Sequence, residues 1–122
     1  MKKLISLFTF ILAITFSAQA QEVKTVSLEQ TKGEFTQKEI KLSEGSYVFN
    51  ISNNSAGTDV GFVLVPEGKD AGDAKNHIKE AYVTKVVAEG KTESSNTVTL
   101  KKGTYKYFCP LNKTPQYTLT VE

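Results

Sequence analysis

Short apolar segments separated by turn-forming residues, roughly every 8–12 residues, are the feature that most constrains how this chain can fold. Apolar and polar side chains alternate along residues 46–51, which is the period of a strand with one buried face. Residues 61–65 are apolar without a break and end at Pro66, as in a strand buried on both faces. This spacing favours an antiparallel β-sandwich over a parallel α/β sheet. We expect about seven strands, at residues 22–28, 34–42, 46–51, 61–65, 96–100, 104–109 and 117–121.

Residues 70–88 are the one segment with a different pattern. They contain good helix formers and no Pro, and Ile78, Tyr82 and Val86 recur at the spacing of one helix face. The β-branched run 83–87 leaves the second half of this segment open between helix and strand. The expected fold class is therefore an all-β sandwich with one helical insertion.

Residues 1–20 have the three parts of a cleavable export signal. Lys2 and Lys3 give a positive start, residues 4–17 are mostly apolar, and Ala18 and Ala20 are the small residues that signal peptidase requires. A membrane anchor is the alternative, but the apolar run is shorter than the roughly 20 residues that span a bilayer. No Cys lies near the cut to carry a lipid. We therefore expect cleavage after residue 20, one domain over residues 21–122, and export to the periplasm or the medium.

The charge balance excludes several kinds of partner. The formal net charge of +2 comes from Lys2 and Lys3, so that it vanishes when the leader is removed. The chain has no Arg and no Lys-rich run interleaved with aromatic residues, which argues against a nucleic-acid partner. No apolar segment after the leader is long enough to cross a membrane. We expect a monomer.

The chain also lacks the patterns of common enzymes. It has no Gly-rich phosphate loop, and no His lies near a Ser or the Cys in a recognisable nucleophile motif. We expect a protein that is not an enzyme. The single cysteine, Cys109, excludes an internal disulfide, and in an oxidising compartment it is a free thiol, a metal ligand or half of an intermolecular bond.

Three stretches together resemble the cupredoxins, the family of the blue copper proteins. Residues 33–53 resemble the opening hairpin of the family, and Gly61-Phe62-Val63-Leu64 is similar to the strand that follows its first copper ligand. Gly103-Thr104-Tyr105-Lys106-Tyr107-Phe108-Cys109-Pro110, with residues 117–121, is similar to its C-terminal ligand loop and last strand. The resemblance implies a Greek-key β-sandwich. It also implies a small exported electron carrier or copper-binding module, with copper and a redox or protein partner.

The ligands that this resemblance implies are mostly missing. A type 1 copper site takes two His nitrogens, a Cys thiolate and a weak axial thioether. Cys109 stands at the thiolate position, but Asn112 stands where the family has His, and Asp59-Val60 stands where the first His would be. The one Met is Met1, in the leader, and the one His is His77. A site with two His ligands therefore cannot form within one chain.

Three residues remain as candidate metal ligands: Cys109 through its thiolate, His77 through its imidazole, and Asp59 through a carboxylate oxygen. Each has a simpler alternative, namely a buried apolar Cys, a solvated surface His and an ordinary loop Asp. Residues 112–115 are expected to form a turn that keeps the last two strands in register without a metal.

Three functional hypotheses follow. The first is an exported, non-enzymatic cupredoxin-like domain with a diverged or lost type 1 copper site, which binds copper through Cys109 or acts as a partner-binding module. The second is a copper-dependent electron-transfer protein whose site is completed by His77 or by another chain. The third is a purely structural or interaction protein that makes its contacts through residues 70–88.

Overall fold

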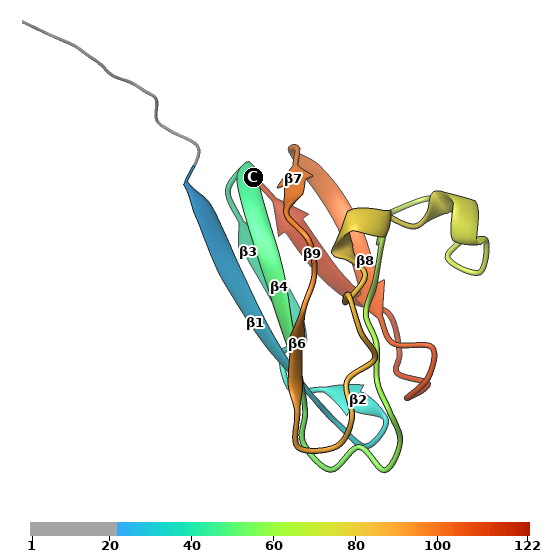
Figure 1. The fold of residues 1–122 in the computed structure, drawn as a ribbon. Coiled ribbons are helices and arrows are strands. Elements are labelled where there is room, and N and C mark those ends of the chain that lie inside the picture. Colours follow the sequence, from blue (N-terminus) through green and yellow to red (C-terminus); the bar gives the residue numbers. More distant parts are fainter. Residues whose placement is uncertain (1–21) are drawn as a thin grey trace, which may run out of the picture.

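The computed structural model describes residues 22–122, and its strands form two sheets that pack face to face (Figure 1). The predicted leader, residues 1–20, lies outside the described residues. The strands are β1 (Val23–Thr31), β2 (Glu34–Phe35), β3 (Glu39–Leu42), β4 (Gly45–Asn53), β5 (Val63–Pro66), β6 (Thr92–Ser94), β7 (Val98–Leu100), β8 (Gly103–Phe108) and β9 (Tyr117–Val121). In this part of the chain no helix is long and apolar enough to cross a membrane. The expected all-β sandwich is confirmed.

The first sheet has the order β2-β1-β4-β6, with β7 also paired to β4, and the second has the order β3-β9-β8-β5. Two pairs are parallel, β1 with β4 and β3 with β9, while the others are antiparallel. The sandwich that the turn spacing favoured is therefore mostly antiparallel, with two parallel pairs that the sequence did not indicate. The parallel pairs arise because the chain crosses from one sheet to the other between β2 and β3 and returns at β4.

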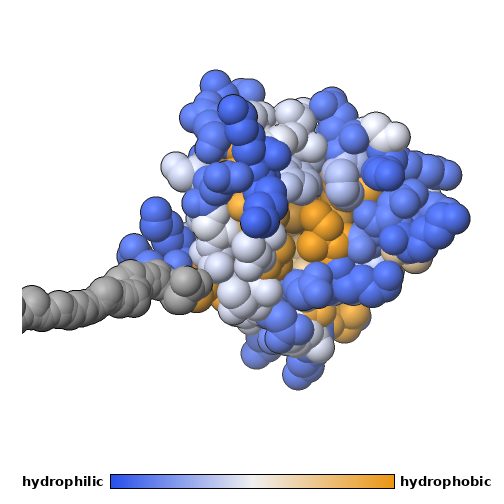
Figure 2. All heavy atoms as spheres, turned by 90° about the horizontal axis from the view of Figure 1, so that it is seen from above, coloured by the Kyte–Doolittle hydropathy of each residue, from blue (hydrophilic) through white to orange (hydrophobic). Residues whose placement is uncertain are grey.

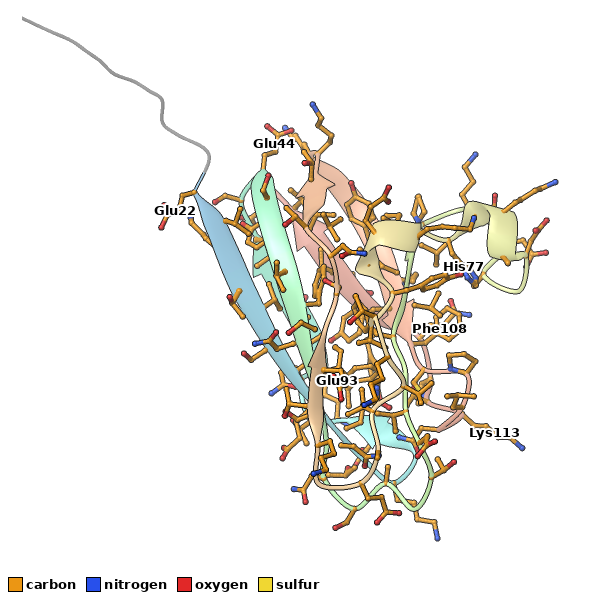
Figure 3. All side chains as sticks on the ribbon, viewed as in Figure 1. Glu22, Glu44, His77, Glu93, Phe108 and Lys113 are labelled. Carbon is orange, nitrogen blue, oxygen red and sulfur yellow. The ribbon has the colours of Figure 1, made fainter. Side chains whose placement is uncertain are left out.

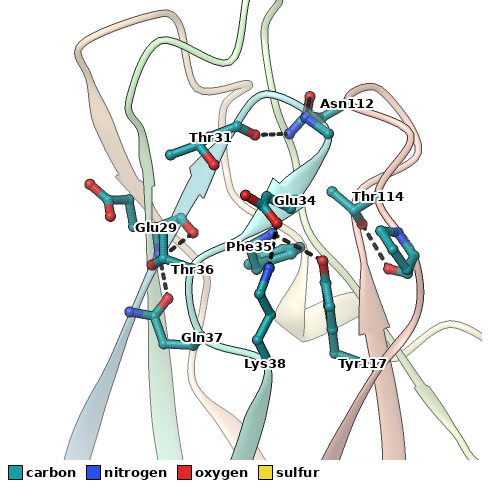
Figure 4. Close-up of polar contacts among 12 residues, drawn as sticks. Glu29, Thr31, Glu34, Phe35, Thr36, Gln37, Lys38, Asn112, Thr114 and Tyr117 are labelled. Carbon is teal, nitrogen blue, oxygen red and sulfur yellow. Dashed lines mark hydrogen bonds and ion pairs between the residues drawn. The ribbon is translucent and has the colours of Figure 1, made fainter.

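The predicted strand at residues 34–42 is in fact two strands that belong to different sheets. Phe35 ends β2 and is fully buried, while β3 begins at Glu39 and pairs with β9. Gln37 lies at the crossing. Its side-chain Oε1 accepts a hydrogen bond from the Glu29 N–H at 2.9 Å, and its carbonyl accepts one from the Tyr107 hydroxyl at 2.6 Å. Figure 4 shows this crossing beside the end of β1.

The core lies between the sheets and is rich in aromatic rings. The alternation predicted for residues 46–51 is confirmed, since Tyr47, Phe49 and Ile51 are all buried. Phe35 meets the rings of Phe62, Tyr107 and Tyr117 edge to face, with centroids 5.2–6.1 Å apart. In the view from above, apolar side chains reach the surface in a limited area that hydrophilic side chains border (Figure 2).

The helix expected at residues 70–88 is not formed. This segment contains two single 3-10 turns, η2 (Ala74–Asn76) and η3 (Lys79–Ala81), in an excursion that projects beside β5 and β8 (Figure 1). Asp73 is extended and caps the start of η2 by accepting from the Lys75 N–H, and the backbone is extended again at His77, so that only one turn forms between them. The β-branched half is extended instead, because Val83 and Val87 make isolated β-bridges to Ser95 and Val60.

Candidate metal centre

Cys109 lies directly after β8 and is completely buried. Its Sγ accepts two backbone hydrogen bonds, from the N–H of Gly61 at 3.2 Å and from the N–H of Asn112 at 3.3 Å. Gly61 belongs to the loop before β5, and Asn112 belongs to the loop after β8. The thiol is thus held between the two loops that the sequence predicts would supply metal ligands.

The side chain of Asn112 turns away from the thiol. It is 7% exposed, and its Nδ2 donates to the Thr31 carbonyl at 2.7 Å and to Gln30 Oε1 at 3.1 Å. Its Oδ1 accepts from the Gly33 N–H at 2.9 Å. Figure 4 shows the bond from Asn112, in the loop after β8, to Thr31 at the end of β1. Both polar atoms of the amide are therefore used in binding the turn between β1 and β2.

The other predicted ligand position is occupied by an apolar side chain. Val60 is fully buried, and its N–H and C=O both pair with Val87, at 3.0 and 2.9 Å. A valine side chain has no atom that can coordinate a metal. Its neighbour Asp59 is exposed to solvent, whereas the Cys109 thiol is buried.

His77 lies in the excursion, on the outside of β8 near Phe108 (Figure 3). Its Nε2 is 2.7 Å from the Ala71 carbonyl, and its Nδ1 is 2.7 Å from the Tyr82 hydroxyl. A carbonyl only accepts, so Nε2 carries a proton and donates to Ala71. Both ring nitrogens therefore have partners within the excursion. Over residues 22–122, no three His, Cys, Asp or Glu side chains come together as a metal-binding group.

The loop after β8 is closed by its own hydrogen bonds. The Thr114 hydroxyl accepts from the Cys109 N–H at 2.9 Å and donates to the Pro115 carbonyl at 2.9 Å. The Thr114 N–H returns a bond to the Cys109 carbonyl at 3.1 Å. The turn expected at residues 112–115 lies slightly earlier, at residues 110–113. These bonds tie the two ends of the loop directly to each other.

Gln30 is the residue of this region that the sequence did not single out. It is completely buried at the end of β1, and its Nε2 donates to the Gly61 carbonyl at 2.7 Å. Its Oε1 accepts from Asn112, as described above. The available signal was its position, since Gln30 follows Leu28 on the inward face of the strand, where an apolar residue is expected.

An apolar cleft of about 320 Å³ lies on the outer side of the same two loops. Leu111 is one of its walls and is 49% exposed, which makes it one of the few large apolar side chains at the surface of residues 22–122. The cleft is lined by Gly61, Phe62, Val63, His77, Tyr82, Val83, Pro110 and Leu111. The thiol of Cys109 does not reach it.

The donors present do not fit a type 1 copper ion. Such a site needs two imidazole nitrogens beside the thiolate. Here one of those positions holds Val60, and the other holds Asn112, whose amide is already bonded. Of the predicted ligand positions, only position 109 holds a residue of the type that a type 1 copper site uses.

Two mixed sheets pack face to face, and Cys109 is held between the loop before β5 and the loop after β8. This arrangement is that of a cupredoxin-type β-sandwich. Residues 4–121 match the family model described as the cupredoxin-like domain. The chain therefore belongs to the cupredoxin-like family.

Solved structures agree with this fold. Auracyanin B is 23% identical, with a TM-score of 0.65 over 81% of this chain and 88% of that one. Auracyanin A, a "blue" copper protein from Chloroflexus aurantiacus, is 21% identical, with a TM-score of 0.66 over 83% and 100% of the two chains. Dithionite-reduced auracyanin from Roseiflexus castenholzii is 19% identical, with a TM-score of 0.62 over 80% and 96%. No curated protein matches the sequence.

Proposed function

We propose that this chain is an exported, non-enzymatic cupredoxin module whose type 1 copper site has been lost. The observation that carries the proposal is the side chain of Asn112, which stands at a ligand position and is fully bonded to the turn between β1 and β2. Turning it toward Cys109 would break three bonds and leave buried groups unpaired, at a cost of about 1–3 kcal/mol for each group. An amide oxygen is also a weak ligand for copper compared with imidazole.

Copper spectroscopy tests this proposal. The reduced protein is titrated with Cu(II) and Cu(I), and its visible spectrum is compared with those of Cys109→Ser and His77→Ala. We expect no intense thiolate-to-copper band in any of the three proteins. An intense band in the wild type that disappears in Cys109→Ser would overturn the proposal.

The alternative is a copper-dependent electron carrier whose site is completed by His77 or by another chain. It is supported by the thiolate position of Cys109 and by the kinship of the fold with auracyanin A, a "blue" copper protein. A site within one chain would require His77 to leave both Ala71 and Tyr82. The same titration separates the two, because a band that needs both Cys109 and His77 supports this carrier.

As a module without type 1 copper, the protein would act by binding a partner, and we favour the apolar cleft beside Leu111 as its contact surface. Burial of an exposed apolar side chain next to a ready-made hollow is favourable for association. A photoreactive residue is placed at Leu111 and, as a control, at Val23, which is 46% exposed and lies on β1. We expect a discrete cross-linked species in cells from position 111 alone. The same species from position 23 would count against the cleft.

Export is the remaining part of the proposal. Expression of the full chain, fractionation of the cells and intact-mass measurement should give a protein that begins at Gln21 in the envelope or the medium. A full-length mass in the membrane fraction would favour the anchor instead.

A further inference from the structure

We propose that Gln30 and Asn112 form a latch that closes three loops over Cys109, in the place where a metal ion would otherwise join them. The loops are the turn between β1 and β2, the loop before β5 and the loop after β8. We call this pair the Gln30–Asn112 latch. It deepens the proposed function and rests on it, since it explains how the loops stay together without copper.

The geometry of the latch spans all three loops. Gln30 stands at the centre, donating to the Gly61 carbonyl on one side and accepting from Asn112 Nδ2 on the other. Asn112 adds bonds to the Thr31 carbonyl and the Gly33 N–H. The bonded residues are 31 to 82 positions apart in the sequence, so that the latch joins segments that no local turn connects.

The latch is also buried, which makes its bonds cooperative and costly to break singly. Gln30 is completely inaccessible and Asn112 nearly so. If one partner is removed, the other loses its bond without gaining water, and the loop that it held is released. The thiol of Cys109 lies beneath, fixed by the N–H groups of Gly61 and Asn112, which belong to two of the latched loops.

The consequence is that the latch controls access to the thiol. The Cys109 side chain is completely buried when the loops are closed. Opening of the loop after β8 would expose it without unfolding of the two sheets, because that loop lies outside β8 and β9. The rate at which an aromatic disulfide reagent labels Cys109 therefore reports on the latch.

The experiment measures this labelling in the presence of a chelator, over a range of low urea concentrations. The variants are Asn112→Ala and Gln30→Met, the second being close in shape but without the amide. The control is Asn54→Ala, since Asn54 is exposed, its amide bonds the Glu29 side chain, and its backbone bond to the Gln30 carbonyl is kept in the variant. We expect the two latch variants to label at least about tenfold faster than the wild type, a ratio that corresponds to about 1.4 kcal/mol. Their rates should depend little on urea, as in local opening, while the control matches the wild type.

Labelling of the latch variants only through global unfolding would overturn the proposal. In that case the rate would rise with urea as steeply as unfolding itself, and would follow the unfolding equilibrium of each variant. Should Asn112→Ala fail to fold, Gln30→Met decides, together with amide exchange in the wild type. There, the N–H groups of Gly61 and Asn112 should exchange together, faster than that of Phe49 in β4. Exchange of all three at one common rate would also refute local opening. Because no copper is present, these results are independent of the copper titration that tests the proposed function.

Discussion

The buried hydroxyl of Tyr107 makes the stability of this fold depend on pH in the alkaline range. Tyr107 is completely buried, and its hydroxyl donates to the Gln37 carbonyl at 2.6 Å, where the chain crosses between the sheets. Burial, and to a smaller extent the nearby Tyr117 and Glu39, raises the pKa of Tyr107 from 10.0 to about 12. The folded state therefore favours the neutral phenol, and the unfolded chain ionises first.

The sign and the size of the effect follow from this difference. The stabilisation that comes from the neutral phenol of Tyr107 is complete below pH 10 and is lost as the pH rises from about 10 toward 12. Two pKa units correspond to about 2.7 kcal/mol, of which about 2 kcal/mol should be gone by pH 11.5. The variant Tyr107→Phe cannot ionise. It should lose about 1–3 kcal/mol at pH 9, through the unpaired Gln37 carbonyl, but change less with pH than the wild type.

Urea unfolding followed by circular dichroism, at pH 9 and pH 11.5, measures both the loss of stability in Tyr107→Phe and the change of stability with pH. The matched control is Tyr105→Phe, which removes the same atom from a hydroxyl that donates to the Lys101 carbonyl at the surface. We expect this control to keep the pH dependence of the wild type. Equal pH dependence in the wild type and Tyr107→Phe would refute the assignment to Tyr107, as would a flattened dependence in the control.

Two further substitutions test the core and the excursion. Phe35→Ala removes the ring at the centre of the aromatic cluster and should lower the free energy of unfolding by about 3–5 kcal/mol, measured by urea unfolding; a loss below about 1 kcal/mol would contradict the packing described here. His77→Ala should speed amide exchange in residues 71–82, because the ring ties Ala71 to Tyr82, and should leave exchange in β4 unchanged. Faster exchange throughout the sheets would show that His77 supports the whole fold instead.

Strand positions and inward faces could be read from the sequence, because they depend on local periodicity. The segments at 46–51 and 117–121 alternate as expected, and each forms a strand with a buried face. Which strands pair, and in which direction, does not follow from periodicity. Phe35 and Ile40 both face the core, but from different sheets. The apolar pattern of residues 34–42 was therefore read as one strand, although the chain passes from one sheet to the other within it. The helix expected at 70–88 failed because the backbone is extended before and after each of the two single turns, and because Val83 and Val87 make β-bridges instead.

The candidate site was predictable in its residue types but not in its connections. The sequence shows that Cys109 lacks the partners of a type 1 site, and that Asn112 stands where a ligand is expected. It does not show that the amide of Asn112 bonds to Gln30, which lies 82 positions earlier. Gln30 has no motif around it. Its role comes only from the fold, which brings the end of β1 against the loop after β8.

The position of β9 has a consequence for the newly made chain. β9 lies between β3 and β8, and β3 has no other partner in its sheet. The second sheet therefore cannot close until Tyr117–Val121 has been synthesised, and β3 waits unpaired until then, although β5 and β8 can already pair. The closure is a slow, non-local step in folding. During that interval the loop after β8, which ends at β9, is anchored at one end only, so that Cys109 beside it is less well covered. An oxidant would therefore reach this thiol more readily in the newly made chain than in the folded protein, where Cys109 is completely buried.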